Sequence, residues 1–403
     1  MSLSWRRLLR QARWRSRVFI RSTWSTVERP FFHAPEPQEG KGVVLLRLDG
    51  IGDFWLSLPL LASLRQAYGG QRLVLLANAL WADLARETGL FSQVVPIAVS
   101  SFLRSPRYRY RQLRELQRLE PFTALWSVAL RRRIAVEDLI AHTLPAQHKY
   151  AWSRDPSAEE VKWLAQTIDK HTYTRLYRDP LPFTAHEWLH AAQQVGSAGL
   201  PPLDFRIYLR LRERWRPTNG TPFIAVIGGA GFPGRRPFPH LFARLAQAFA
   251  TQLGSAIRLF GGASDRPYLE AIAELLPSTP IKVEAGSLTL PQVVKELLSA
   301  QVVIAPETGL AHVAATLGIP TFLVAGGGHW GRFIPYPAEA PFLLKVLYHP
   351  LPCYGCGWHC IYRLRPGQPF FCLQTIDPEK ATEEALLWWE THIGTPSSPF
   401  PRA

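Results

Sequence analysis

The sequence predicts an α/β protein made of two doubly wound domains that face each other across a central cleft. Short apolar runs alternate with segments of helical periodicity, this alternation breaks off in the middle of the chain, and it restarts near residue 223. Continuous apolar runs are typical of parallel strands that are buried on both faces. Ligands of such folds bind at the carboxyl ends of the strands, where two glycine-containing turns of this chain fall.

The size and charge of the chain limit its possible functions. Its 403 residues, of which 47% are hydrophobic, suffice for two domains, each with its own core. It carries 46 Lys and Arg residues against 31 Asp and Glu residues, a formal net charge of +15. Such an excess favours polyanionic partners, which include phosphates, anionic lipid headgroups and nucleic acid.

Residues 1–38 are predicted to form a basic amphipathic segment. Seven arginines precede the first acidic residue, Glu28, and large apolar residues lie between them. The segment has neither the run of about 18 apolar residues needed to span a bilayer nor the apolar region and cleavage site of a signal peptide. We expect a cytoplasmic protein, peripheral on the anionic inner face of the cytoplasmic membrane. A helix packed on the protein body is the alternative, and no nucleic-acid partner is expected because no recognised motif accompanies the arginines.

The first domain is predicted over residues 39–212. Strands are expected at 43–47, 72–77, 94–97 and 124–128, and helices at 55–68, 159–169 and 187–195. A very basic, aromatic section covers residues 104–133. Residues 210–220 are interpreted as the linker between the domains, because they are charged and end in glycine.

The second domain is predicted over residues 213–393, and a tail rich in Pro and Ser, 394–403, is expected to be disordered. Strands are expected at 223–227, 257–260, 302–304 and 321–324, and helices at 240–253, 268–276, 290–298, 311–317 and 378–393. The last of these helices either packs on the first domain or completes the second.

The first chemically suggestive motif is Arg47-Leu-Asp-Gly-Ile-Gly-Asp53, which follows the first apolar strand. Its glycines, Gly50 and Gly52, allow a tight turn and close approach of a ligand to the N–H groups of the next helix. Asp53 then lies in the first turn of that helix. A simple helix-capping role for Asp53 is the alternative. Two glycines without a third are a weak dinucleotide-binding signal.

The second motif is Pro306-Glu-Thr-Gly-Leu-Ala-His312, which follows a strand of the second domain. The free N–H groups, the Thr308 hydroxyl and the helix dipole suit a phosphate group. An ordinary capped turn is again the alternative. Arg235 and Arg236, after a glycine-rich turn at 228–231, add positive charge to the same carboxyl-end surface.

Together the two motifs resemble the heptosyltransferase family, glycosyltransferase family 9, which has the GT-B fold. The stretch 43–54, with its apolar strand, arginine and Gly-Asp turn, is similar to the family's first motif. The stretch 307–312, followed by Ala314-Ala315 and Gly318-Ile-Pro320, is similar to the family's Asp-Thr-Gly-Leu-x-His signature. The resemblance covers residues 41–389 and is weak between 130 and 217.

The resemblance implies inverting transfer of a heptose or similar sugar from a nucleotide diphosphate donor, such as ADP-heptose, to a saccharide or lipid-linked acceptor. The first domain would hold the acceptor, and the product would belong to a bacterial surface glycan such as lipopolysaccharide. Asp53 stands where the family has its proposed general base. The implied donor-binding residues are Gly52, Gly229, Arg236, Gly262, Glu307, Thr308, Gly309 and His312. No catalytic metal is expected.

Two substitutions depart from the family pattern. Glu307 replaces the usual aspartate, and Arg236 replaces a lysine that contacts the donor phosphates. Either change could alter the donor or its pose while activity persists. Asp49 is an alternative base. A nucleotide-sugar epimerase on the same fold, or a non-catalytic nucleotide-sugar-binding assembly protein, are the alternative functions.

The four cysteines of the chain, Cys353, Cys356, Cys360 and Cys372, fall within 20 residues in the loop 353–372. Four soft ligands so close together suit a tetrahedral structural site for zinc or iron. Free thiols and disulfides are the alternatives, and a cytoplasmic location disfavours disulfides. A similar cluster occurs in parts of the resembled family.

Overall fold

The computed structural model describes most of the chain as two compact units. The described residues are 16, 19–33, 39–153, 162–217, 220–362, 364–365 and 367–393. The first unit takes in residues up to 50, 60–182 and 190–204, and the second takes in 51–59, 183–189 and 205 onward. The short segment 51–59, which carries Asp53, therefore belongs with the second unit. The predicted domain limits at 38, 212 and 393 stay predictions.

The first unit contains a parallel sheet of six strands in the order β3-β2-β1-β4-β5-β6. The strands are β1 Val43–Arg47, β2 Leu73–Asn78, β3 Gln93–Ile97, β4 Phe122–Ser127, β5 Ala146–Trp152 and β6 Arg175–Tyr177. The neighbouring strands β1 and β2 are buried along their whole length. The order reverses between β1 and β4, which is the topological switch point of a doubly wound sheet.

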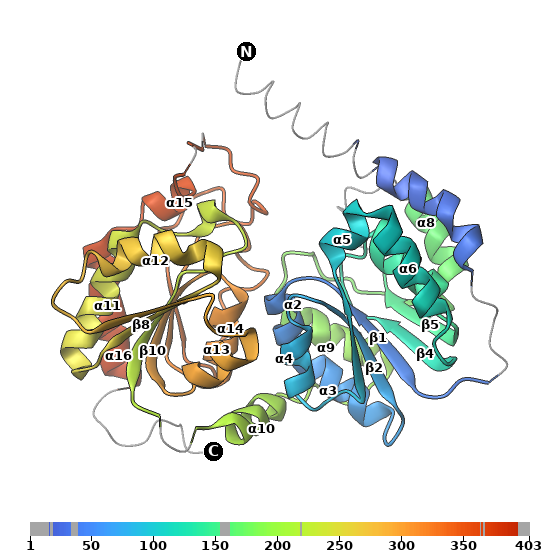
Figure 1. Ribbon diagram of the computed structural model, residues 1–403, viewed down its shortest axis with the longest axis horizontal. Helices are drawn as coiled ribbons and strands as arrows, with labels where there is room; N and C mark the ends of the chain where they lie inside the picture. The colour runs from blue at the N-terminus through green and yellow to red at the C-terminus, as the bar shows by residue number, and fades with distance from the viewer. Residues whose placement is uncertain are drawn as a thin grey trace, which may run out of the picture. The chain divides into compact units, whose positions relative to one another are not determined.

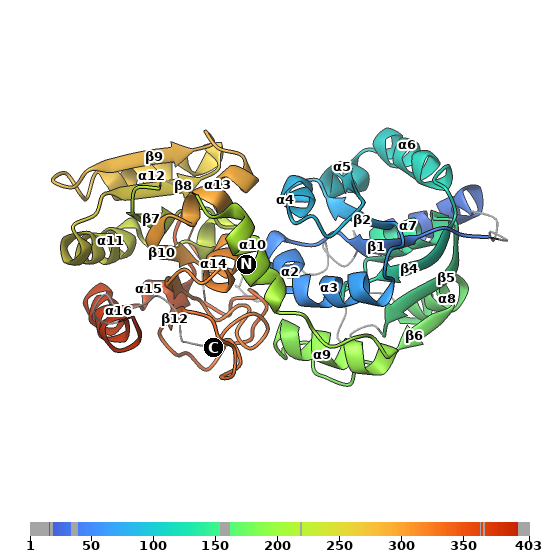
Figure 2. The ribbon, with the colours of Figure 1, turned by 90° about the horizontal axis from the view of Figure 1, so that it is seen from below.

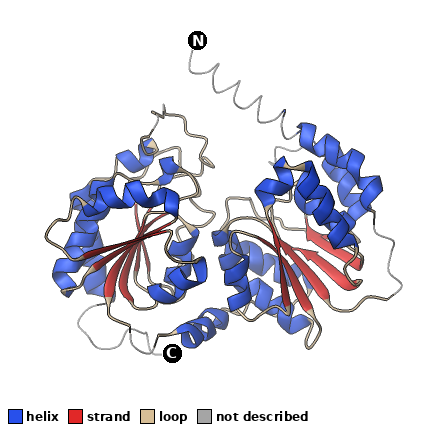
Figure 3. Ribbon diagram, viewed as in Figure 1, coloured by secondary structure: helices blue, strands red, loops and turns tan. Residues whose placement is uncertain are grey.

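Helices flank this sheet (Figure 3). They are α3 Leu58–Ala67, α4 Ala82–Glu87, α5 Val99–Arg104, α6 Pro106–Gln117, η2 Ile134–Asp138, α7 Leu139–Thr143, α8 Lys162–Thr172 and α9 Glu187–Ala198. A helical stretch at residues 19–28 continues into the short 3-10 helix η1 Arg29–Phe32. The core lies between α6, α7 and strands β1, β2 and β4, and it includes Phe102, Leu113 and Phe122.

The second unit repeats the same topology, in the order β12-β11-β10-β7-β8-β9. Its strands are β7 Phe223–Ile227, β8 Ile257–Gly261, β9 Ile281–Ala285, β10 Ala300–Pro306, β11 Thr321–Val324 and β12 Leu344–Leu347. Every pairing is parallel. The switch point lies between β7 and β10, so the turns that follow these two strands flank the position where doubly wound folds bind ligands.

Helices cover both faces of this sheet (Figure 1). The helices of the second unit are α2 Ile51–Leu56, α10 Arg206–Trp215, η3 Pro233–Arg235, α11 Pro239–Leu253, η4 Ala263–Asp265, α12 Arg266–Ala273, α13 Leu290–Leu297, α14 Gly309–Thr316, α15 Phe371–Gln374 and α16 Pro378–His392. Gly254 ends α11 in the left-handed conformation, which glycine adopts without steric cost.

The C-terminal helix α16 completes the second unit. It lies beside α11 (Figure 2), where Trp389 contacts Phe249 and Trp388 contacts Phe322. Asp377 accepts hydrogen bonds from the N–H groups of Glu379 and Lys380 and so caps the helix. Of the two expected placements of this helix, the structure adopts the one that completes the second domain.

The fold class predicted from the sequence is confirmed, but several elements differ. The strands β5, β6, β9 and β12 were not predicted, because their exposed and polar residues obscure the apolar pattern. The predicted linker 210–220 is wrong over 210–215, which form the end of α10. Leu211 and Trp215 of this helix are buried, so the charged sequence is one face of an amphipathic helix.

Two predictions concern residues outside the described ranges. These are the interpretation of residues 1–15 as the start of a basic amphipathic segment and that of 394–403 as a disordered tail. Within the described part of the chain, no helix is long and apolar enough to cross a membrane.

Candidate functional site

The structure brings the predicted site residues of the second unit into two groups. The first group, which we name the α2–α14 junction, consists of Gly52, Asp53, Glu307, Thr308, Gly309 and His312. The second, which we name the Asp265 cluster, consists of Gly229, Arg236, Gly262 and Asp265. The two motifs that lie more than 250 positions apart in the sequence therefore meet at one place.

The N-terminal ends of α2 and α14 approach each other at the junction through Gly52 and Gly309, and the approach requires glycine at position 309. A Cβ atom at Gly309 would overlap the Ile51 side chain, so only glycine fits there. A Cβ atom at Gly52 would lie 3.4 Å from Gly309 Cα and 3.5 Å from His312 Cδ2, which is ordinary contact. The Trp55 indole donates to the Thr316 hydroxyl, 2.6 Å between Nε1 and Oγ1, and fixes the other ends of the two helices.

The electrostatics of the junction favour negative charge. Both helices direct their N-terminal ends toward it, and these ends carry the positive pole of the helix dipole. Asp53 lies in the first turn of α2. Thr308 is the N-cap of α14, and its side chain makes no capping hydrogen bond, so the hydroxyl is available to a ligand.

Glu307 has a buried carboxylate, of which one oxygen forms an ion pair. Its Oε1 atom pairs with Nδ1 of His329, whereas Oε2 has no hydrogen-bond partner among the described residues. Only 5% of Glu307 is exposed. A buried carboxylate oxygen is costly to leave unpaired, so this atom is a candidate acceptor for a hydroxyl of a bound ligand.

His312 is a buried, neutral imidazole. Burial, together with the nearby His186 and His329, lowers its pKa to about 3. Its Nδ1 atom lies 2.9 Å from the Tyr336 hydroxyl. Burial raises the pKa of Tyr336, so the phenol keeps its proton and can donate to Nδ1. His312 therefore supplies orientation and hydrogen bonding to the junction, not positive charge.

Arg235 supplies the positive charge of the junction. Its guanidinium lies 4.5 Å from the Trp358 ring centroid. Burial lowers its pKa, while the carboxylates of Glu307 and Asp53 oppose that shift. One arginine thus interacts with both acidic residues of the junction. From the sequence, Arg236 and not Arg235 was predicted to bind the donor.

Arg236 lies instead in the Asp265 cluster. It forms an ion pair with Oδ1 of Asp265 and lies over the Tyr268 ring, 5.4 Å from its centroid. The other carboxylate oxygen of Asp265 accepts a 2.9 Å hydrogen bond from the Gly262 N–H. A Cβ atom at Gly229 would lie 3.1 Å from this same oxygen. The cluster therefore ties the turn after β7 to the turn after β8.

A family model for "Glycosyltransferase family 9 (heptosyltransferase)" matches residues 139–353, more than half of the chain. The chain belongs to glycosyltransferase family 9. The matched stretch of this family 9 chain includes the second motif and the Asp265 cluster, and it begins after the first motif. The resemblance stated from the two motifs is confirmed.

The chain is also similar to individual proteins, to one in sequence and to others in fold. Over 109 residues the chain is 33% identical to "Lipooligosaccharide heptosyltransferase 2" of Haemophilus influenzae, an alignment that covers 26% of this chain and 31% of that relative. The fold is similar to that of E. coli heptosyltransferase WaaC with ADP, at a TM-score of 0.62, 17% identity and coverage of 85% and 99% of the two chains. It is also similar to that of TibC of enterotoxigenic E. coli H10407, described as an iron-containing dodecameric glycosyltransferase. The TM-score is 0.50, the identity is 13%, and the alignment covers 90% of this chain and 82% of TibC.

Several residues at the site were not predicted from the sequence. They are Asp265, His329, Tyr336 and Trp358, while Arg235 had been noted only as positive charge at the strand ends. His329 follows the glycine run 326–328 after β11, at another strand's carboxyl end, and this position was a usable signal. Tyr336 and Trp358 come from long loops, where neither periodicity nor a motif marks them.

The four cysteines lie in a loop that packs on the glycine run after β11. The Gly355 and Gly357 N–H groups donate to the carbonyls of Gly327 and Gly328. All four thiols are free. Burial, together with the other three thiols, raises the pKa of Cys372 to about 11. Among the described residues, no three His, Cys, Asp or Glu side chains are arranged as metal ligands.

Proposed function

We propose that this family 9 chain is an inverting glycosyltransferase that moves a heptose or similar sugar from an ADP-heptose-like donor to a saccharide or lipid-linked acceptor of a bacterial surface glycan. The observation that carries the proposal is the α2–α14 junction, where two helix N-termini, two carboxylates and Arg235 meet. Its relatives support the choice of donor and product, since one is named for lipooligosaccharide synthesis and another was solved with ADP. The match to the lipooligosaccharide relative spans about a third of that protein.

Asp53 acts as the general base in this proposal. It removes the proton of the acceptor hydroxyl while the hydroxyl oxygen attacks the anomeric carbon of the donor, and the bond from that carbon to the diphosphate breaks. The diphosphate leaves with the bonding electrons, so negative charge grows on the donor phosphates. Attack from the face opposite the leaving group inverts the configuration.

Arg235 and the N-terminal end of α14 stabilise this growing charge. Arg235 is the partly buried cation that interacts with both Asp53 and Glu307, and Thr308 with the neighbouring N–H groups adds hydrogen bonds. Glu307, through its unpartnered Oε2, accepts a hydrogen bond from a donor hydroxyl. Arg236, held by Asp265, keeps the turn after β7 in place.

We also propose a structural metal at the four cysteines. The donor set suits tetrahedral zinc or iron, the other three thiols help to raise the pKa of Cys372, and a fold relative is described as iron-containing. The bound metal would hold the loop 353–372 against Gly327 and Gly328, and Trp358 of this loop contacts Arg235. Elemental analysis of the purified protein tests this: less than half an equivalent of zinc and iron combined would reject it.

Donor binding and transfer are tested in two stages. Thermal stabilisation is measured with ADP-, UDP- and GDP-linked sugars at near-millimolar concentration, and the best binder is then incubated with and without a lipid-linked saccharide acceptor. We expect an ADP-linked heptose to stabilise the protein and its turnover to require acceptor. Conversion of the donor without acceptor would indicate an epimerase, and stabilisation without any turnover would indicate a binding protein. No stabilisation by any nucleotide sugar would reject the proposal.

A further inference from the structure

The helical stretch at residues 19–28 has its polarity reversed for a helix that packs on a soluble domain. Its inward face carries the small polar residues Ser22 and Ser25, which are at most 3% exposed. Its outward face carries Ile20, Trp24 and Val27, and Phe31 follows one turn later in η1. These four apolar side chains are between 59% and 68% exposed. Their spacing of four, three and four residues places them in one row.

This reversed orientation is fixed by specific contacts and does not reflect a loosely attached terminus. Arg29, buried on the inward side, donates 2.9 Å to the Thr172 hydroxyl and 3.2 Å to the Asp138 carbonyl. Glu28 pairs with Arg109 of α6, 2.6 Å between Oε1 and Nη2. The apolar row is therefore held outward by the body of the first unit, and turning it inward would break these contacts.

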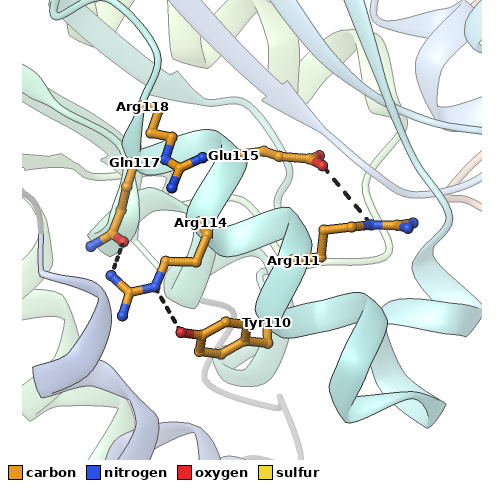
Figure 4. A pocket seen from close by; sticks show the side chains of 6 residues that line it. All are labelled: Tyr110, Arg111, Arg114, Glu115, Gln117 and Arg118. Atoms are coloured by element: carbon orange, nitrogen blue, oxygen red, sulfur yellow. Dashed lines mark hydrogen bonds and ion pairs between the residues drawn. The ribbon is translucent and has the colours of Figure 1, made fainter.

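The neighbouring helix α6 presents a row of arginines with the same spacing. Arg107, Arg111, Arg114 and Arg118 are all exposed, and Leu113 and Leu116 on the opposite face are buried. Figure 4 shows three of these arginines along the helix, with Glu115 as the one acidic side chain among them. Glu115 lies 3.9 Å from Arg111, and Arg107 and Arg118 have no ion-pair partner among the described residues.

The apolar row and the arginine row belong to one surface. Phe32, at the end of η1, contacts the edge of Tyr110 on α6, with 5.5 Å between ring centroids. Arg114 lies over both rings, at 5.4 Å from Phe32 and 5.3 Å from Tyr110. The Gln117 amide adds a hydrogen bond to the His33 carbonyl. We name this surface, which consists of the apolar row and the arginine row, the helical pair.

We propose that the helical pair docks on an anionic lipid bilayer, with the apolar row inserted at the headgroup level and the arginine row on the lipid phosphates. Exposed Trp, Phe and Ile beside arginines suit this boundary, because the rings and alkyl groups leave water while the guanidinium groups stay among the phosphates. The fixed positive charge selects an anionic surface over a neutral one. The remaining arginines before residue 22 carry charge of the same sign.

Vesicle flotation of the full chain tests this proposal. The probes are vesicles of phosphatidylcholine alone and of phosphatidylcholine with phosphatidylglycerol, at low salt and at about 0.5 M salt. We expect binding to the anionic vesicles only, and weaker binding at high salt. The arginine variant is R107Q/R111Q/R118Q, which leaves Arg114 and its ring contacts in place. Its affinity should fall by about a hundredfold, since each neutralised arginine costs about fivefold.

Two matched controls separate the surface from its general charge and hydrophobicity. R86Q/R178Q/R244Q removes three exposed arginines of α4, of the loop after β6 and of α11, and it should bind as the unchanged protein does. I20Q/W24Q/V27Q should lose vesicle binding, whereas L209Q/L275Q/L387Q, also at exposed positions, should keep it. Circular dichroism melting of every variant shows that the fold is intact.

Three results would overturn the proposal. Equal losses for R107Q/R111Q/R118Q and its control would mean that net charge alone drives binding. Undiminished vesicle binding by I20Q/W24Q/V27Q would mean that the apolar row does not insert. An oligomer in light scattering that I20Q/W24Q/V27Q dissociates, together with no vesicle binding by the unchanged protein, would assign the surface to a second copy of this chain.

Discussion

The α2–α14 junction and the Asp265 cluster each hold one of two consecutive arginines, and they use them in opposite ways. Arg236 forms an ion pair with Asp265, whose second oxygen is occupied by the Gly262 N–H. Arg235 interacts with Asp53 and Glu307 together, and Glu307 retains an oxygen without a partner among the described residues. In the cluster both oxygens of the Asp265 carboxylate are occupied, whereas in the junction one oxygen of the Glu307 carboxylate is left for a ligand; the Nε atoms of both arginines have no partner among the described residues.

This difference assigns separate physical roles to neighbouring residues. In a buried ion pair such as that of Arg236 and Asp265, removal of one charged group lowers the stability of the fold because the other charge loses its partner. In an open site, removal of one member costs binding or rate, and stability changes little. The junction should therefore respond to substitution through activity, and the Asp265 cluster through folding.

The largest expected effect is on activity, for D53N in the junction. Asparagine keeps the size and the helical position of Asp53 but cannot take a proton from the acceptor. We expect kcat to fall by about 10²- to 10⁴-fold, with the donor-induced thermal stabilisation retained. Transfer assays with the acceptor, beside thermal shifts with the donor, measure the two quantities separately.

D49N is the matched control for D53N. Asp49 is bound through Oδ1 to the buried Arg47, 2.8 Å from Nε, which suits a structural role. If D49N loses as much kcat as D53N while its melting temperature is unchanged, the base role is shared or belongs to Asp49. If D53N leaves transfer intact, the junction is not the catalytic site.

The second prediction sets R235Q against R236Q. We expect R235Q to lower kcat by about 10²- to 10³-fold and to leave the melting temperature nearly unchanged. We expect R236Q to destabilise the fold by about 3 kcal/mol, because the mostly buried Asp265 carboxylate loses its cationic partner. Chemical denaturation and donor-dependent transfer rates of both variants decide the matter. The reverse assignment would mean that Arg236 holds the donor.

The contrast between these arginines also shows how far the sequence could lead. The alternation of apolar runs with helical segments predicted both doubly wound sheets. Strands such as β1 and β7 are buried on both faces of the sheet, and this burial requires continuous apolar runs. The same rules placed Asp53, Thr308 and Gly309 at strand ends. Nothing in the local sequence distinguishes Arg235 from Arg236, since their roles depend on Asp265 and Trp358, which lie about 30 and 120 positions away.

Long-range packing explains the other omissions as well. That Gly52 and Gly309 would meet depends on how α2 packs on α14, which no single stretch encodes. From the sequence alone, the apolar row of residues 19–28 would be expected to face the protein core. The contacts of Arg29 with Thr172 and of Glu28 with Arg109 hold it outward instead.

The third prediction compares the two glycines of the junction. G309A should destabilise the fold by about 1–3 kcal/mol, because its methyl group would overlap Ile51 in a close-packed contact. G52A places its methyl group at ordinary contact distance from Gly309 and His312 and should change stability by less than about 0.5 kcal/mol. Denaturant unfolding of both variants measures the difference. Equal effects would show that the helices do not approach as described.

The fourth prediction concerns the pH dependence of stability, through His312. Its folded pKa of about 3 lies below the ordinary value of 6.5, so the unfolded chain binds this proton more readily than the folded one does. The resulting stability is fully present above pH 6.5 and is lost as the pH falls toward 3, by at most about 1.4 kcal/mol per pH unit.

H312Q isolates this contribution, because His142 of the first unit titrates in the same direction and remains in both proteins. Glutamine can accept the Tyr336 hydrogen bond without gaining a charge. We expect the free energy of unfolding of H312Q to fall less steeply than that of the unchanged protein between pH 6.5 and 4, and the two slopes to agree above pH 7. Parallel curves over the whole range would mean that His312 is accessible to protons in the folded state, and the junction would then be open to solvent as well as to a ligand.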